Sequence, residues 1–133
     1  MKIIEVVAAI IIKDDLILCM QRNDGPLEYI SRKYEFPGGK IEENEAHHVA
    51  LMRELIEEMN LDLRISPEDY YMTVDHTYPD FRIIMHSYIC MVTDIDFIMN
   101  EHIDFRWLPK EQLRILDWAP ADLPIVERLF EED

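Results

Sequence analysis

The chain has 133 residues, of which 49% are hydrophobic and 31% are charged, as expected for a soluble globular protein. This length predicts one domain over residues 1–133, large enough to bury a core and too short for two. The net charge is −15, from 28 acidic and 13 basic residues, and it excludes sequence-independent binding to DNA or RNA, which needs basic contacts to phosphate.

The first residues do not resemble a targeting segment. Glu5 interrupts the apolar opening, and Lys13 to Asp15 close it without a small-residue cleavage site. No apolar stretch approaches the roughly 20 residues of a membrane span. Cys19 and Cys90 lie in apolar runs without metal-ligand spacing, which predicts buried thiols in a reducing compartment. We therefore expect a cytoplasmic protein with no membrane partner.

The first half of the chain predicts strands and then a helix. Runs rich in β-branched residues indicate strands over residues 3–12 and 16–21, joined by a tight turn, and a short extended piece over 34–36. Loop formers occupy residues 22–32, and Pro37-Gly38-Gly39 ends the extended piece. Apolar residues at helical spacing predict a helix over residues 45–59, with Asn60 as a left-handed cap.

The second half repeats this order. Strands are expected over residues 70–78, 81–93 and 103–108, the first two separated by a turn at Pro79-Asp80. A one-turn helix is expected over residues 109–113, and a terminal helix over 121–130 with Pro124 in its first turn. Strands, helix, strands and helix in this order predict an α/β (α+β) fold with a mixed sheet.

The helix over 45–59 carries a cluster of acids. Glu54, Glu57 and Glu58 are three and four residues apart, which places three carboxylates on one helix face. Such a cluster repels itself unless a cation lies among the oxygens. A hard divalent cation such as Mg²⁺ prefers oxygen ligands and usually also holds substrate phosphates. Another interpretation is a solvated acidic face with a salt bridge from Arg53.

From Gly39 the chain reads GKIEENEAHHVALMRELIEEMNL, which resembles the Nudix hydrolase signature G-x5-E-x7-R-E-U-x-E-E-x-G-U, where U is a bulky aliphatic residue. Only the last glycine differs, and Asn60 stands there. Because asparagine tolerates left-handed backbone geometry, we expect this change to have little effect. The resemblance implies the Nudix fold, an α/β/α sandwich with a central mixed sheet and the motif as a loop-helix-loop.

The similarity extends beyond this signature. A resemblance to MutT-type nucleoside triphosphate pyrophosphohydrolases is carried by the segment YEFPGGKIE, by Tyr78-Pro79-Asp80 and by the ending APADLP. The CTP pyrophosphohydrolase branch of this subfamily is more similar still, in the opening EVVAAII with Gln21-Arg22 and in the same ending. The metal ligands that this implies for Mg²⁺ or Mn²⁺ are the Gly39 carbonyl, Glu54, Glu57, Glu58 and Glu101. Arg53 would hold Glu57 four residues away, and Glu45 would support the loop. The general base is either Glu57 or Glu101.

The same resemblance implies a nucleotide pocket. Its residues are Arg22, Glu35, Phe36, Lys40, Tyr78 and Asp122. Arg22 would contact the nucleotide, Phe36 and Tyr78 would line the base site, and Lys40 would contact phosphate or pair with an acid. Asp122 replaces an asparagine that reads the base edge, and an ionised aspartate only accepts hydrogen bonds, for example from a cytosine amino group or a guanine N–H. Alternatively, Asp122 caps the terminal helix.

The expected activity is hydrolysis of a (deoxy)nucleoside triphosphate to the monophosphate and pyrophosphate. Two substrate classes compete: an oxidised purine such as 8-oxo-dGTP, whose removal belongs to nucleotide-pool sanitation and DNA repair, and (d)CTP or a modified pyrimidine, which the APAD ending mildly favours. The alternative is a non-catalytic module that binds nucleotides or regulates. The expected partner is a small nucleotide, and the protein is a monomer or homodimer. The five histidines are not expected to form a metal set.

Overall fold

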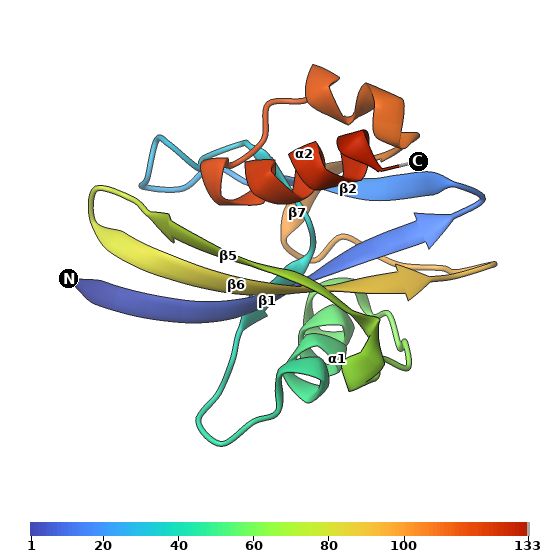
Figure 1. The fold of residues 1–133 in the computed structure, drawn as a ribbon, viewed down its shortest axis with the longest axis horizontal. Coiled ribbons are helices and arrows are strands. Elements are labelled where there is room, and N and C mark those ends of the chain that lie inside the picture. Colours follow the sequence, from blue (N-terminus) through green and yellow to red (C-terminus); the bar gives the residue numbers. More distant parts are fainter. Residues whose placement is uncertain (133) are drawn as a thin grey trace.

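The computed structural model describes residues 1–132 (Figure 1). Within these residues, the strands are β1 Lys2–Lys13, β2 Leu16–Arg22, β3 Tyr34–Glu35, β4 Gly38–Lys40, β5 Tyr70–Thr77, β6 Phe81–Met91 and β7 His102–Leu108. The helices are α1 His47–Met59 and α2 Leu123–Glu131, with 3₁₀ turns at Pro67–Asp69, Lys110–Ile115 and Pro120–Asp122.

One mixed sheet organises the chain. Its strand order is β3-β2-β1-β6-β5, with β4 added to β1 and β7 added to β2. The long strands β1 and β6 run parallel from the pair Lys2–Phe81 to the pair Ile12–Met91, whereas the other pairings are antiparallel. The mixed sheet predicted from the order of the elements is therefore confirmed.

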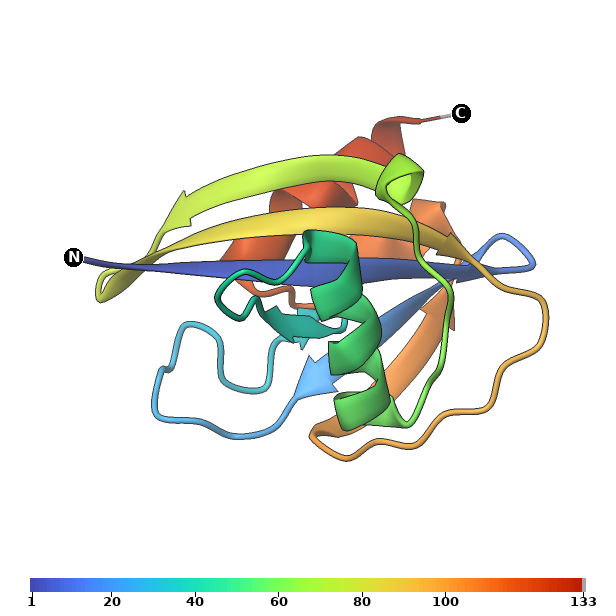
Figure 2. The ribbon, with the colours of Figure 1, turned by 90° about the horizontal axis from the view of Figure 1, so that it is seen from below.

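The two helices cover opposite faces of this sheet (Figures 1 and 2). Successive residues of a strand face opposite sides. On β1, Val7, Ala9 and Ile11 pack with Leu51 and other core residues of α1, while Ala8 and Ile10 pack on the α2 side. Burial of both faces explains why β1 reads as a nearly continuous apolar run. The predicted α/β/α sandwich is confirmed.

The first residues of both helices differ from the sequence prediction. The first helix begins at His47 instead of residue 45, because the preceding turn includes Asn44 with a positive φ of 62°. Asn60 ends this helix in the left-handed conformation, with φ 53° and ψ 36°, and its N–H donates to the Ile56 carbonyl. This cap is confirmed. The terminal helix begins at Leu123, two residues later than predicted, after a 3₁₀ turn.

Strand β4 was not predicted, because two of its three residues are glycines, which strands usually lack. It pairs with residues 6–8 of β1. A Cβ on Gly38 would lie 2.8 Å from the carbonyl carbon of Val7 and closer still to its oxygen. Glycine therefore permits a close backbone approach that brings Gly39 beside α1.

Two findings concern sequence features outside the fold itself. Within residues 1–132, no helix combines the length and apolarity needed to cross a membrane. Cys19 and Cys90 are buried free thiols, as predicted, and burial raises the pKa of each to about 12. Such thiols are unreactive at neutral pH.

Candidate functional site

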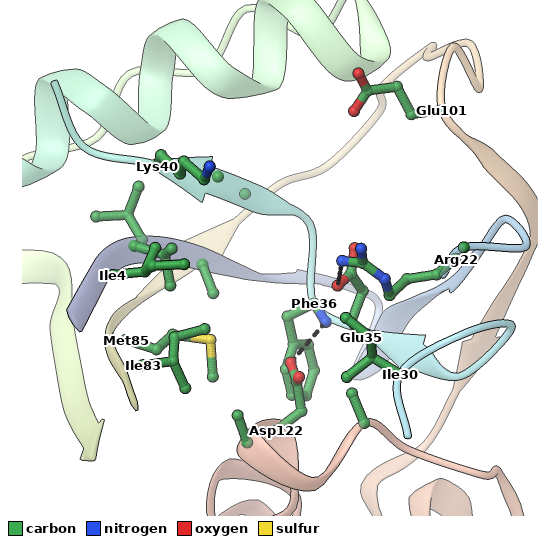
Figure 3. A pocket seen from close by; sticks show the side chains of 18 of the residues that line it. Ile4, Arg22, Ile30, Glu35, Phe36, Lys40, Ile83, Met85, Glu101 and Asp122 are labelled. Atoms are coloured by element: carbon green, nitrogen blue, oxygen red, sulfur yellow. Dashed lines mark hydrogen bonds and ion pairs between the residues drawn. The ribbon is translucent and has the colours of Figure 1, made fainter. Parts of the chain in front are cut away.

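A pocket of about 400 Å³ opens between β1, β4, β6 and the turn Pro120–Asp122 (Figure 3). Its apolar wall includes Ile4, Ile83 and Met85. Sequence reasoning did not identify this wall, although the alternation along β1 places Ile4, Val6 and Ala8 on one face. All six residues predicted to bind the nucleotide line this pocket.

The aromatic walls of the pocket are held firmly. Phe36 is 3% exposed, and its ring centroid lies 4.8 Å from that of Trp118. Tyr78 is also buried; its hydroxyl oxygen accepts a hydrogen bond from the Ala121 N–H at 3.0 Å, and its ring stacks on Tyr29 at 4.9 Å. Both rings therefore present a preformed apolar surface to a ligand.

Asp122 faces the pocket from below in Figure 3, and its Oδ1 accepts a hydrogen bond from the Phe36 N–H at 3.1 Å. Its side chain makes no capping bond to α2, so the capping interpretation is wrong. Burial, and then the charge of Glu35, raise the pKa of Asp122 well above its ordinary value. The buried carboxyl group is therefore favoured as a neutral acid, which can donate as well as accept.

Glu35 links the predicted Arg22 to a histidine that sequence reasoning missed. Arg22 Nη1 donates to Glu35 Oε1 at 3.0 Å, and His102 Nε2 lies 2.9 Å from Glu35 Oε2. The His102 side chain is 3% exposed, and its Nδ1 has no hydrogen-bond partner within residues 1–132. The signal for His102 was its place at the start of β7, next to Glu101.

Arg53 gathers the acids of the motif. Its Nε and Nη2 donate to the two carboxylate oxygens of Glu45 at 2.8 and 2.9 Å, and Nη2 also donates to the Lys40 carbonyl at 3.0 Å. Nη1 donates to Glu54 at 3.0 Å and to both oxygens of Glu57 at 3.3 Å. The bonds from Arg53 lower the pKa of Glu45 to about 2. The predicted pair with Glu57 exists, but the forked contact with Glu45 is shorter.

Two further acids of α1 are shielded from solvent: Glu54 is half-buried and Glu58 is buried. Glu54 lies against Gly39, where a Cβ would come within 2.8 Å of Glu54 Oε1. Glu58 is 8% exposed, and its Oε2 has no partner within the described chain. Burial, and then the charges of Glu35, Glu101 and Glu54, raise the pKa of Glu58 to about 9. A buried, unpaired carboxylate oxygen of this kind fits a cation as neighbour.

Glu101 reaches the site from a distant part of the sequence. The segment before it is bonded to the end of α1: the Asn100 N–H donates to the Glu58 carbonyl at 3.1 Å, and Asn100 Nδ2 donates to the Glu57 carbonyl at 3.0 Å. Figure 3 shows the Glu101 carboxylate beside α1, across the pocket from Asp122. Tertiary bonds thus bring it to the motif helix.

The side chains predicted to bind the metal lie near one another, but their carboxylate oxygens do not meet at one point. Among residues 1–132, Glu54, Glu57, Glu58 and Glu101 do not form a set with ligand atoms within 4.8 Å of one another. Repulsion between like charges favours this spread, and Glu57, whose side chain is 58% exposed, turns to Arg53. A different set, Glu5, His47 and His86, does meet that distance. The sequence did not lead us to expect that two of the histidines lie this close to one carboxylate.

Several known proteins are similar to this chain over nearly its whole length. A family model described as NUDIX domain matches residues 2–129. The CTP pyrophosphohydrolase of Escherichia coli K12 is 36% identical over 129 residues, which cover 96% of this chain and 91% of that protein. The 8-oxo-dGTP diphosphatase of Haemophilus influenzae is 30% identical, covering 98% and 94%. The solution structure of the DNA mismatch repair protein MutT from methicillin-resistant Staphylococcus aureus 252 is 38% identical, with a TM-score of 0.75 over 100% of both chains.

Proposed function

This chain belongs to the NUDIX family, and we propose that it hydrolyses a nucleoside triphosphate to the monophosphate and pyrophosphate with Mg²⁺ or Mn²⁺. Water adds across the phosphoanhydride bond between the α- and β-phosphates, which breaks to give the monophosphate and pyrophosphate. The relatives named as a CTP pyrophosphohydrolase and an 8-oxo-dGTP diphosphatase support this reaction class.

One observation carries the proposal: Glu58 Oε2 is buried, has no partner within residues 1–132, and lies among other carboxylates. An unpaired buried polar atom is costly unless a ligand satisfies it. Glu54, Glu57, Glu58 and Glu101 would hold the cation, together with the Gly39 carbonyl. When bound, the cation would supply Lewis-acid stabilisation of the phosphoryl oxygens and lower the pKa of a coordinated water.

The protein groups orient this site. Arg53 bonds Glu45, Glu54 and Glu57 at once, so it can hold two of the proposed ligands while Glu45 anchors the guanidinium. Two exposed carboxylates, Glu57 and Glu101, are candidates to accept the proton of the attacking water. Replacing each of them singly by Gln at saturating Mg²⁺ distinguishes the two, because only loss of the general base should remove the fall of kcat at low pH.

For the base, we propose that Asp122 acts as a neutral acid. Its O–H would donate to cytosine N3, and its carbonyl oxygen would accept from the cytosine amino group. This pattern, together with the 36% identity to the CTP pyrophosphohydrolase, favours (d)CTP or a modified pyrimidine triphosphate. Guanine also offers an acceptor and an N–H side by side at O6 and N1, so 8-oxo-dGTP is the second candidate.

The test is a panel of triphosphates that includes dCTP, CTP, 5-methyl-dCTP, 8-oxo-dGTP and dGTP, assayed with Mg²⁺ for pyrophosphate release. We expect the highest kcat/KM for a cytidine nucleotide. The highest value for 8-oxo-dGTP would favour the second candidate, and no release from any member, with nucleotide still bound, would favour the non-catalytic module. This proposed role as a small-nucleotide enzyme needs no nucleic acid polymer.

The role of Asp122 has its own test. An amide can donate and accept as a neutral acid does, so Asp122→Asn should keep kcat/KM for the best cytidine substrate within about fivefold, whereas Asp122→Ala should lose about 10 to 100-fold. Equal losses in both variants would show that Asp122 does not act as a donor and acceptor pair.

A further inference from the structure

A second cluster of metal-binding groups lies on the α1 side of the sheet, and none of its three residues lines the pocket. Glu5 is on β1, His86 on β6, and His47 is the first residue of α1. His86 pairs with Val7 in the parallel register, so it shares a sheet face with Glu5, two residues earlier on β1. Figure 2 shows the start of α1 over these two strands. Three elements thus bring two imidazoles and a carboxylate together.

The contacts are those of a chelating group. One ligand atom from each residue lies within 4.8 Å of the other two. His86 Nε2 is 2.7 Å, and His47 Nε2 is 3.9 Å, from the same oxygen, Glu5 Oε2. The two rings stack with centroids 4.2 Å apart and planes at 17°. Both imidazoles therefore direct the same ring nitrogen to one carboxylate oxygen.

A neighbouring strand orients one of the imidazoles. Thr73 Oγ1 on β5 lies 2.8 Å from His86 Nδ1, and Tyr70 Oη lies 2.6 Å from the same hydroxyl. Without a metal, His86 Nε2–H can donate to Glu5 Oε2 at 2.7 Å; with a metal bound, Nδ1–H would donate to Thr73 and leave the lone pair of Nε2 for the cation. A hydrogen-bonded second nitrogen is the usual support of a metal-ligating histidine. The His86 side chain is 13% exposed and fixed, whereas His47, at 40%, can tilt out of the stack to complete the coordination.

We propose that Glu5, His47 and His86 form a second cation site, selective for a transition metal such as Zn²⁺. Two imidazoles and one carboxylate suit Zn²⁺, Co²⁺ or Ni²⁺, while Mg²⁺ prefers a set of oxygens. Three protein ligands leave a position for water. The net charge of −15 favours cation binding in general.

The site is separate from the acids of the motif. Glu57 follows His47 by ten residues on α1, which corresponds to about 15 Å along the helix axis. A metal here would connect β1, β6 and the start of α1. The Glu5 carbonyl accepts a hydrogen bond from the Ile41 N–H at 3.1 Å, so the site also adjoins the loop that carries Glu45. Binding should therefore stabilise the folded protein without taking part in hydrolysis.

The experiment uses the untagged full chain, stripped with a chelator and then saturated with millimolar Mg²⁺. Bound Zn²⁺ is measured by equilibrium dialysis, and the melting temperature is measured with and without Zn²⁺. We expect about one equivalent of Zn²⁺ and a rise in melting temperature of about 5 °C or more. His47→Ala and Glu5→Gln should each lower the Zn²⁺ affinity at least tenfold.

Two matched variants make the outcome decisive. His48→Ala removes a neighbouring histidine of the same helix, and Glu57→Gln alters the acidic motif, so both should keep the Zn²⁺ equivalent. His47 is partly exposed, so His47→Ala should fold, and its far-UV circular dichroism checks this. The proposal is overturned if the wild type binds no Zn²⁺ in the presence of Mg²⁺, if His47→Ala binds as well as His48→Ala, or if Glu57→Gln loses the equivalent.

Discussion

Gly39→Ala isolates the contact between β4 and the motif helix. The new Cβ would lie 2.8 Å from Glu54 Oε1 and closer to Oε2 and Cδ, whereas ordinary contact begins at 3.4 Å. The Glu54 carboxylate must therefore move by on the order of 1 Å. A misplacement of that size in a catalytic group can cost about 10²-fold in rate, or about 2.7 kcal/mol. We expect kcat/KM to fall by about this factor.

The assay is pyrophosphate release from the best triphosphate, measured over a range of Mg²⁺ concentrations, with urea unfolding of the same samples. The stability of Gly39→Ala should change little, because the collision is with a side chain that can swing. In Gly38→Ala the new Cβ meets the backbone of Val7, so that variant should lose about 1–3 kcal/mol of stability instead. Gly25, with nothing within 4 Å and no positive φ, should gain about 0.4–1 kcal/mol on change to Ala.

Activity of Gly39→Ala within twofold of the wild type would refute the proposed role of Glu54 and the need for glycine at this position. A fall in activity that only follows the loss of folded protein would refute it as well.

Three further predictions concern the acids and Arg53. Glu57→Gln should abolish turnover and leave the melting temperature unchanged, because this side chain is 58% exposed; undiminished turnover would contradict its assignment to the metal site. Without divalent cations, the pKa of Glu58 is about 9 in the folded protein and near 4.5 in the unfolded chain. The folded state therefore holds a proton that the unfolded chain releases, and the free energy of unfolding should fall as pH rises between these two values. The free energy of unfolding should change by up to about 1.4 kcal/mol per pH unit for one proton. Urea unfolding of the wild type and Glu58→Gln at a series of pH values measures this slope, which the variant should lose. Identical slopes in the two proteins would show that Glu58 is not the group responsible. In Arg53→Lys the forked contact with Glu45 is lost, because a lysine has a single ammonium group. We expect kcat/KM to fall about 10 to 100-fold. An unchanged kcat/KM would mean that this contact does not orient Glu54 and Glu57.

Local patterns were enough to predict the chemistry class and most elements. The spacing of Glu54, Glu57 and Glu58 depends only on helical periodicity, and their appearance on one helix needs no tertiary information. The left-handed cap at Asn60 is also a local property of that residue type. Helix starts were less accurate, because the turn at Asn44 and the bonds of Glu45 to Arg53 involve more than local preference.

The environment of the ionisable side chains in the pocket could be learned only from the tertiary structure. The motif alone could not show that Asp122 is buried near Glu35, which raises the pKa of Asp122 and favours its protonated form. Likewise, the pairing of His102 with Glu35 joins residues 67 positions apart. Desolvation and neighbouring charge set a pKa, and both are properties of the packed chain.

The sequence by itself therefore determined the family and the sandwich of helices on a mixed sheet, and it predicted a metal site on the helix after Gly39, since each rests on residue type and short-range spacing. Only the tertiary structure decided that Glu101 meets this helix, that Glu58 keeps an unpaired buried oxygen, and that His47 stacks on His86. Those contacts join distant segments, and their energies arise from burial and charge that no local pattern encodes.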